Sequence, residues 1–254
     1  MLIDSHAHLQ DPLLLPEIEE ILKRAQEAGV QTIVCPGYDL ESSRAAIDIA
    51  EKYPQVFAAV GIHPGNLTDL DRNVWDELAD LAQHPRVVAI GEMGLDYVNG
   101  FPDKDKQQDV FRRQLELAGK MDLPVIIHNR ESHADVLNMA QAIGQLPKGG
   151  VMHCFSGSAE LAEEFLNLGY YISFAGPVTF KNARRLPQVA ASIPTKRLLC
   201  ETDSPYLSPE PYRGKRNEPA RVIHVAAKLA KLLDQELEDL APILTANTKT
   251  LFCI

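Results

Sequence analysis

Two histidines and an aspartate alternate near the start of the chain, where residues 1–9 read MLIDSHAHL. This stretch is short, begins apolar and runs into a helix-like segment, so we predict a strand. Successive side chains of a strand point to opposite faces, so Asp4, His6 and His8 should share one face. Two imidazoles on one face could hold a cation, whereas a single histidine near a terminus is more often a surface or core residue. The later chain decides between these interpretations.

Side chains of the metal-binding types also stand at the ends of later apolar segments. They are His63, Glu92, His128, His153 and Asp203. Burying that many polar groups together costs several kcal/mol apiece unless they are paired or bind a metal. Core packing alone therefore explains the set poorly.

Eight apolar segments, each followed by an amphipathic one, must position these side chains. The predicted strands are residues 1–9, 30–37, 56–63, 87–92, 124–128, 150–153, 170–174 and 197–203. The predicted helices are residues 16–28, 40–53, 73–83, 107–120, 132–143, 159–168, 183–191, 220–233 and 235–244, with a loop at 99–105. This alternation indicates an α/β protein with a parallel sheet, and eight units in 254 residues favour a single-domain (β/α)8 TIM barrel over an open sheet. The candidate ligands fall at the carboxyl ends of the strands, where such barrels carry their active sites.

The candidate ligands are too many for one catalytic ion, which usually takes three protein ligands. We therefore predict two divalent ions that share Glu92. Histidine and carboxylate ligands suit Zn²⁺, Mn²⁺, Ni²⁺ or Fe²⁺, and the carboxylates also suit Mg²⁺. The first ion is assigned to His6, His8, Glu92 and Asp203, and the second to Glu92, His128 and His153. Such a pair would stabilise the attacking and leaving oxygens of a displacement.

Two further carboxylates lie one layer deeper in the predicted barrel. Glu201 has the same strand parity as Asp203, so it should face the interior. It either orients a ligand or takes part directly in the chemistry. Asp4 stands in the same relation to His6, and we predict that it supports this histidine.

The loop at residues 204–219, after the eighth predicted strand, combines basic side chains with Tyr206 and Tyr212. Guanidinium and ammonium groups bind phosphates, and aromatic faces stack on bases. The alternative is a solvated charged surface. We predict substrate binding for Arg130, Arg213, Lys215 and Arg216.

Composition limits the remaining possibilities. The net charge of −10 has the wrong sign for a protein that coats long nucleic acid, so any nucleic acid should meet a local basic site. The four cysteines form no CxxC pair and are predicted to be reduced core residues. No apolar run approaches the roughly 20 residues of a membrane span, and we see no secretory signal. We expect a cytoplasmic protein without membrane contact.

Together these motifs resemble the TatD family of metal-dependent hydrolases and DNases, within the amidohydrolase-like barrels. The matching stretches are DSHAHL at 4–9, GIHP at 61–64, GEMGLDY at 91–97, PVIIHNR at 124–130, HCFSG at 153–157, ETDSP at 201–205, RGKRNEP at 213–219 and NT at 247–248. The resemblance implies a (β/α)8 barrel, a divalent-metal site and phosphodiester hydrolysis, often as a 3′→5′ exonuclease on DNA. Glu92 matches the family's bridging carboxylate. The family often has a second histidine where this chain has Gly65, which weakens a role for that loop beyond His63.

The hypothesis is therefore hydrolysis of DNA ends or oligonucleotides, with no obligate protein partner. Asp203 would act as general base, while His63 and Arg130 neutralise charge on the phosphoryl oxygens. One alternative is a C–N hydrolase acting on a cyclic amide or a deaminase substrate, because this metal arrangement can cleave several bond types. The other alternative is a non-enzymatic binding protein whose metal site is a relic. The basic, tyrosine-bearing loop favours phosphate, and the complete ligand set favours an enzyme.

Overall fold

Eight parallel strands form the centre of the molecule in the computed structural model, which describes residues 1–67, 70, 73–98 and 103–254. Residues 99–102 of the predicted loop lie outside this range. Each strand pairs with the next along the chain, in the order β1 to β8. The strands are β1 (Leu2–Asp4), β2 (Val30–Pro36), β3 (Val56–Val60), β4 (Val87–Asp96), β5 (Val125–Arg130), β6 (Gly150–Met152), β7 (Tyr171–Phe174) and β8 (Leu198–Cys200). The predicted (β/α)8 barrel is confirmed.

The barrel closes where β8 meets β1. The Asp203 amide donates to the His6 carbonyl at 2.9 Å, and the His8 amide donates to the Ser204 carbonyl at 2.8 Å. These bonds lie past the ends of both strands, because β1 ends at Asp4 and β8 ends at Cys200. The predicted strands 1–9 and 197–203 were therefore too long. Their carboxyl-terminal halves are irregular segments that still hold each other in place.

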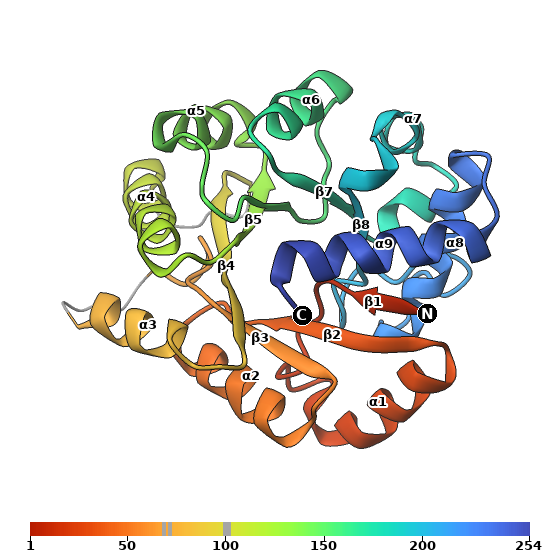
Figure 1. Ribbon diagram of the computed structural model, residues 1–254, viewed down its shortest axis with the longest axis horizontal. Coiled ribbons are helices and arrows are strands. Elements are labelled where there is room, and N and C mark those ends of the chain that lie inside the picture. Colours follow the sequence, from red (N-terminus) through yellow and green to blue (C-terminus); the bar gives the residue numbers. More distant parts are fainter. Residues whose placement is uncertain (68–69, 71–72, 99–102) are drawn as a thin grey trace.

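Helices surround the strands on the outside (Figure 1). They are α1 (Ile18–Glu27), α2 (Leu40–Lys52), α3 (Val74–Ala82), α4 (Lys104–Met121), α5 (His133–Ile143), α6 (Ala159–Asn167), α7 (Leu186–Ser192), α8 (Val222–Leu232) and α9 (Leu237–Phe252). Asp39, Asp103 and Ser158 cap α2, α4 and α6 by accepting a hydrogen bond from a first-turn amide. The helices agree with the predicted ones to within a few residues, except that α9 continues to Phe252 instead of ending at residue 244.

The last turn of α9 explains this extension. Leu251 and Phe252 are buried against the side chains that fill the barrel interior. These interior side chains are Val34, Ala59, Val88, Ala89, Ile126, Val151, Tyr171 and Leu199. Figure 1 shows α9 lying across the strands beside both chain termini. The interior is therefore a packed core that α9 covers.

Two of the four cysteines are not core residues. Cys35 and Cys200 are buried as predicted, but Cys154 is half-buried and Cys253 is exposed. The prediction was wrong for the second pair because Cys154 follows the end of β6 and Cys253 follows the end of α9. All four are free thiols. Within the described chain, no helix combines the length and the apolar character that crossing a membrane requires.

Candidate metal centre

Glu92 lies at an irregular point of β4. The register between β4 and β5 shifts between Ile90 and Met93, so one extra residue is accommodated there. The Glu92 amide donates to the Gly37 carbonyl, which follows β2, at 2.8 Å. Such a bulge redirects a side chain relative to its neighbours on the strand. Here it accompanies a carboxylate that is 4% exposed and surrounded by histidines.

The two oxygens of Glu92 face two different pairs of imidazoles. Oε2 lies 3.3 Å from His6 Nε2 and 3.4 Å from His8 Nε2. Oε1 lies 3.0 Å from His128 Nδ1 and 2.9 Å from His153 Nε2. The strand ends β1, β5 and β6 are far apart in the sequence, yet they bring four histidines to one carboxylate. The arrangement has the form expected of a carboxylate shared between two cations.

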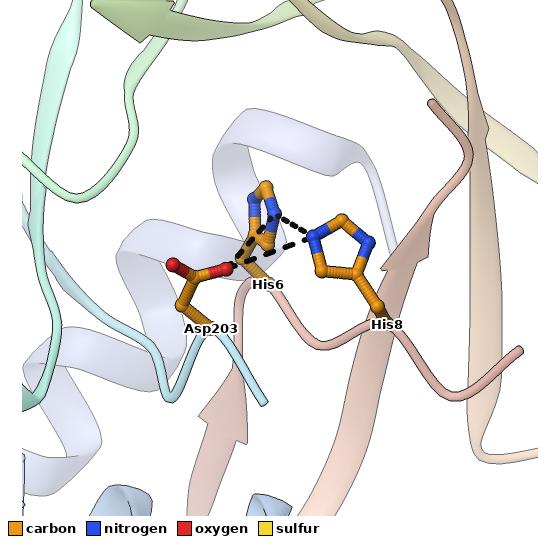
Figure 2. A group of neighbouring side chains, drawn as sticks. All are labelled: His6, His8 and Asp203. Atoms are coloured by element: carbon orange, nitrogen blue, oxygen red, sulfur yellow. Dashed lines mark hydrogen bonds and ion pairs between the residues drawn. The ribbon is translucent and has the colours of Figure 1, made fainter. Parts of the chain in front are cut away.

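Asp203 completes the group on the Oε2 side (Figure 2). Its Oδ1 lies 3.6 Å from His8 Nε2 and 3.8 Å from His6 Nε2, and the two Nε2 atoms are 3.2 Å apart. Asp203 adopts a positive φ of 56°, a conformation that aspartate tolerates better than most residues. The three side chains supply nitrogen and oxygen donors within 4.8 Å of one another.

The outer ring nitrogens of two histidines fix the tautomer of each. His8 Nδ1 lies 3.1 Å from the Pro36 carbonyl, and His153 Nδ1 lies 3.2 Å from Glu201 Oε1. A carbonyl or a carboxylate can only accept, so each Nδ1 carries the hydrogen. The Nε2 atoms of His8 and His153 therefore face Glu92, and once they lose their hydrogen they can offer a lone pair to a metal ion, as in metal-ligating histidines.

Asp96 plays the corresponding part for His128. Its Oδ2 lies 3.3 Å from His128 Nε2, which therefore carries the hydrogen and leaves the Nδ1 lone pair facing Glu92. The sequence analysis did not single out Asp96. It stands four residues after Glu92 on β4, so its strand parity was the signal that could have identified it.

Imidazole nitrogens and carboxylates that face one another at this distance require positive charge between them, which is either a proton on the ring or a metal ion in its place. Burial disfavours protonation of His8, but its hydrogen bonds to Asp203 and Glu92 outweigh burial and raise its pKa to about 10. Burial likewise favours the neutral form of Glu92, yet the surrounding histidines hold its pKa well below the usual value. Nitrogen and oxygen donors in a negatively charged pocket are the ligands that divalent cations bind. The residues present therefore fit divalent metal ions.

His63 differs from the other histidines of the centre. Its Nδ1 accepts a hydrogen bond from the Gly65 amide at 3.0 Å, so the hydrogen of the neutral ring is on Nε2. This Nε2 lies 3.7 Å from Glu92 Oε1. Burial lowers the pKa of His63 to about 4, which keeps the ring neutral. The imidazole therefore presents a hydrogen-bond donor to the centre, whereas a metal ligand would present a lone pair.

Glu201 is buried beneath His153. Besides His153 Nδ1, it accepts the Cys154 amide at 2.6 Å and the Ser173 hydroxyl at 2.7 Å. With 1% exposure it has no access to a substrate. Of the two roles considered for Glu201, the geometry corresponds to orienting a ligand.

Asp4 is also fully buried, and it contacts His6 only through the backbone, while Thr202 is its main partner. It accepts hydrogen bonds from the Thr202 amide and hydroxyl at 2.8 and 2.5 Å, and from the His6 amide at 3.3 Å. Burial raises its pKa to about 8. Asp4 therefore ties β1 to the chain after β8 and touches the backbone of His6, not its ring. Within the described residues, the buried His6 Nδ1 has no hydrogen-bond partner.

A cavity of about 980 Å³ opens above these groups. Among the predicted substrate-binding residues, Arg130 lines it. The other three are not among its lining residues. Arg216 pairs with Glu17 at 2.9 Å, Arg213 donates to Asn182 at 3.0 Å, and Lys215 lies over the Tyr212 ring. Their role in substrate binding stays a prediction.

Comparison with known proteins gives matches along the whole chain. A family model described as TatD related DNase matches residues 3–253. The uncharacterized metal-dependent hydrolase YabD of Bacillus subtilis (strain 168) is 45% identical over 254 residues, which cover 100% of both chains. The 3′-5′ ssDNA/RNA exonuclease TatD of Citrobacter koseri is 34% identical over 259 residues, covering 100% of this chain and 99% of that protein. The crystal structure of YJJV, a TatD homologue from Escherichia coli K12, superposes with a TM-score of 0.95 at 36% identity, covering 100% of this chain and 98% of that one.

Proposed function

Because the chain belongs to the TatD-related DNase family of metal-dependent hydrolases, we propose that it cleaves phosphodiester bonds at the ends of nucleic acid strands. The 34% identical relative named a 3′-5′ ssDNA/RNA exonuclease supports cleavage from the 3′ end, and its name adds RNA to the DNA that we predicted as substrate. A net charge of −10 agrees with a substrate held locally at one cavity, and not along an extended surface.

The division of Glu92 between two pairs of histidines carries this proposal. One divalent ion would be held by His6, His8, Glu92 and Asp203, and a second by Glu92, His128 and His153. Two ions that share a carboxylate are a common arrangement for in-line displacement at phosphorus. The ligand set suits Mg²⁺, Mn²⁺, Zn²⁺ or Ni²⁺, and it does not choose among them.

Each remaining group has a place in the proposed reaction. When bound, the ions lower the pKa of water and neutralise charge on the phosphoryl group. Asp203, at the cavity floor, takes the proton of the attacking water as general base. His63 donates its Nε2 hydrogen to a phosphoryl oxygen. The guanidinium of Arg130 binds the same phosphate, and its planar donors suit two of the oxygens. Arg213, Lys215 and Arg216 would meet only a strand that extends beyond the cavity.

Digestion of end-labelled single- and double-stranded DNA and of RNA tests the proposal, with the bound metal quantified on the same sample. We expect stepwise shortening from the 3′ end that stops with chelator and returns when a divalent salt is added. Undiminished cleavage by a metal-free sample would contradict the metal assignment.

A set of cyclic amides and amino-substituted bases, offered to the same metal-loaded enzyme, tests the C–N hydrolase alternative. Turnover of these compounds without turnover of oligonucleotides would replace the phosphodiester proposal. Binding of a partner that is unchanged by chelator, without turnover of either class, would favour a binding protein.

A further inference from the structure

Two tyrosines stand on one side of the cavity, next to His8. Tyr38 follows β2 and Tyr206 follows β8, and both line the cavity. Their ring centroids lie 5.8 and 6.4 Å from that of His8, with interplanar angles of 65° and 64°. Both rings therefore stand edge-to-face against the same imidazole, and neither is stacked flat on it. Aromatic faces are thus placed beside the candidate metal centre.

Tyr206 is held in place although its side chain is open to solvent. Its hydroxyl donates to Asp11 Oδ2 at 2.9 Å, and Asp11 Oδ1 in turn accepts the Leu13 amide at 2.8 Å. Its own carbonyl accepts the Asn217 side-chain amide at 2.7 Å. The residue is nevertheless 53% exposed. An aromatic ring that is fixed before binding and exposed to solvent can stack on a ligand at a low entropic cost.

Tyr38 is fixed through its backbone. Its amide donates to Ser42 Oγ at 2.8 Å, and its carbonyl accepts the His63 amide at 2.9 Å. The residue is half-buried. It is therefore tied to the start of α2 on one side and to the loop after β3 on the other.

The opposite side of the cavity is charged. Asp96, Arg130 and Glu131 line it at the ends of β4 and β5. The Glu92 group lies between this charged side and the tyrosines. The volume of about 980 Å³ is at the upper end of the range of about 300–1,000 Å³ for small-molecule sites, so it accommodates a terminal nucleotide with its phosphate.

We propose that Tyr38 and Tyr206 form a nucleobase subsite in which the terminal base of the strand stacks while its phosphate reaches Glu92 and Arg130. This inference rests on the proposed phosphodiester hydrolysis and names what that site recognises beyond the phosphate. Stacking on an aromatic ring accepts every base, because each has a π face. The subsite therefore predicts an enzyme that selects unpaired strand ends and is tolerant of sequence.

Two chromogenic diesters with the same leaving group test the subsite. Thymidine 5′-(p-nitrophenyl phosphate) carries a base, and methyl p-nitrophenyl phosphate carries none. Tyr206→Ala should lower kcat/KM for the thymidine ester at least tenfold, mainly by raising KM, and should change kcat/KM for the methyl ester less than twofold. Tyr206→Phe is the matched control, because it keeps the ring and loses only the hydrogen bond to Asp11. It should retain most of the preference for the thymidine ester.

Tyr38→Ala provides a second, independent variant and should show the same selective loss. Oligonucleotides ending in a thymidine or in an abasic residue extend the comparison to the natural linkage. Equal loss on both esters would show that the rings act through His8, and would overturn the subsite. Equal efficiency of the unsubstituted enzyme on the two esters would also overturn it, while leaving phosphodiester hydrolysis intact. Absence of turnover of any phosphodiester by the metal-loaded enzyme would instead refute the proposed function itself.

Discussion

Replacing Asp96 with asparagine should weaken binding of one ion and not the other. In the native protein, Asp96 Oδ1 accepts the Val98 amide at 2.9 Å, and Oδ2 accepts His128 Nε2 at 3.3 Å. Asparagine keeps the shape but can accept through only one of these two atoms. If its oxygen stays on Val98, its amide group faces the Nε2–H of His128, and two donors meet. His128 then has to move its hydrogen to Nδ1, the atom that faces Glu92.

The expected loss of affinity for the second ion follows from the interactions that each orientation of the asparagine amide lacks. Turning the oxygen toward His128 leaves two donors facing each other at Val98 instead, which costs about 0.5–1.5 kcal/mol for the lost hydrogen bond. Both orientations also remove the negative charge of the Asp96 carboxylate, which lies beside His128 Nε2 on the side of the ring away from Glu92. Changes to such outer partners typically cost about 10–100-fold in metal affinity. We therefore expect Asp96→Asn to weaken the second ion by about 1.4–2.7 kcal/mol.

The assay is a titration of metal-free protein with Mn²⁺ or Zn²⁺ against a chromogenic chelator, which resolves two successive affinities. Asp135→Asn is the matched control. Asp135 accepts hydrogen bonds from Tyr97 and Gln108 and contacts no histidine of the centre in the described structure, so both affinities should stay at the wild-type values. Wild-type binding of both ions by Asp96→Asn, or equal weakening of both, would refute the proposal that Asp96 sets the tautomer of His128.

Four further outcomes are expected. Glu92→Gln should release both ions together and abolish hydrolysis while the circular dichroism spectrum stays native, and loss of one ion alone would contradict a shared carboxylate. His63→Ala should keep both ions, by metal analysis, while kcat falls about 10²–10³-fold; an ion lost with the imidazole would make His63 a ligand. Chelation should lower the melting temperature in calorimetry, because a ligand at a hundred times its Kd adds about 2.7 kcal/mol to the unfolding free energy. Leu251→Ala should cost about 2–5 kcal/mol in denaturant unfolding, with kcat/KM unchanged well below the transition; a lower kcat/KM there would show that the packing of α9 influences the centre.

The barrel could be predicted from the sequence because its signals are local. Each strand is an apolar run with a helix after it, and each ligand-type residue follows or ends such a run. The alternation of Asp4, His6 and His8 correctly predicted that the two histidine rings lie together, although the strand itself ends at Asp4. The closing hydrogen bonds to the chain after β8 keep the segment of His6 and His8 in place.

Asp96 was missed because the predicted strand at residues 87–92 ended at Glu92. In the structure β4 continues through Gly94 to Asp96. Gly94 has a φ of 145°, and a Cβ there would lie 1.9 Å from the carbonyl oxygen of His128. The glycine is needed for the close approach of β5, which brings His128 beside Asp96. Gly94, which interrupts the apolar pattern of the sequence, is therefore required for the geometry of the site.

Ion pairs between residues that are distant in the sequence could not be predicted from it either. The predicted role of Arg216 in substrate binding stays a prediction, but the structure adds that its guanidinium pairs with Glu17, which precedes α1. The sequence of the loop at residues 204–219 contains no signal that Arg216 pairs with Glu17. Local composition predicts charge, and the fold decides which charges neutralise each other.

The histidines show the same limit at the level of single atoms. His63 and His128 both lie beside Oε1 of Glu92, and as residue types they are equivalent. Their outer neighbours are opposite, because the Gly65 amide donates to His63 whereas Asp96 accepts from His128. One ring therefore offers a hydrogen to the centre, and the other offers a lone pair. The proposed phosphodiester hydrolysis uses both, since lone pairs would hold the cations and donors would meet the phosphate. The outer hydrogen-bond partners of the imidazoles therefore determine which ring donates a hydrogen and which ring can bind a cation.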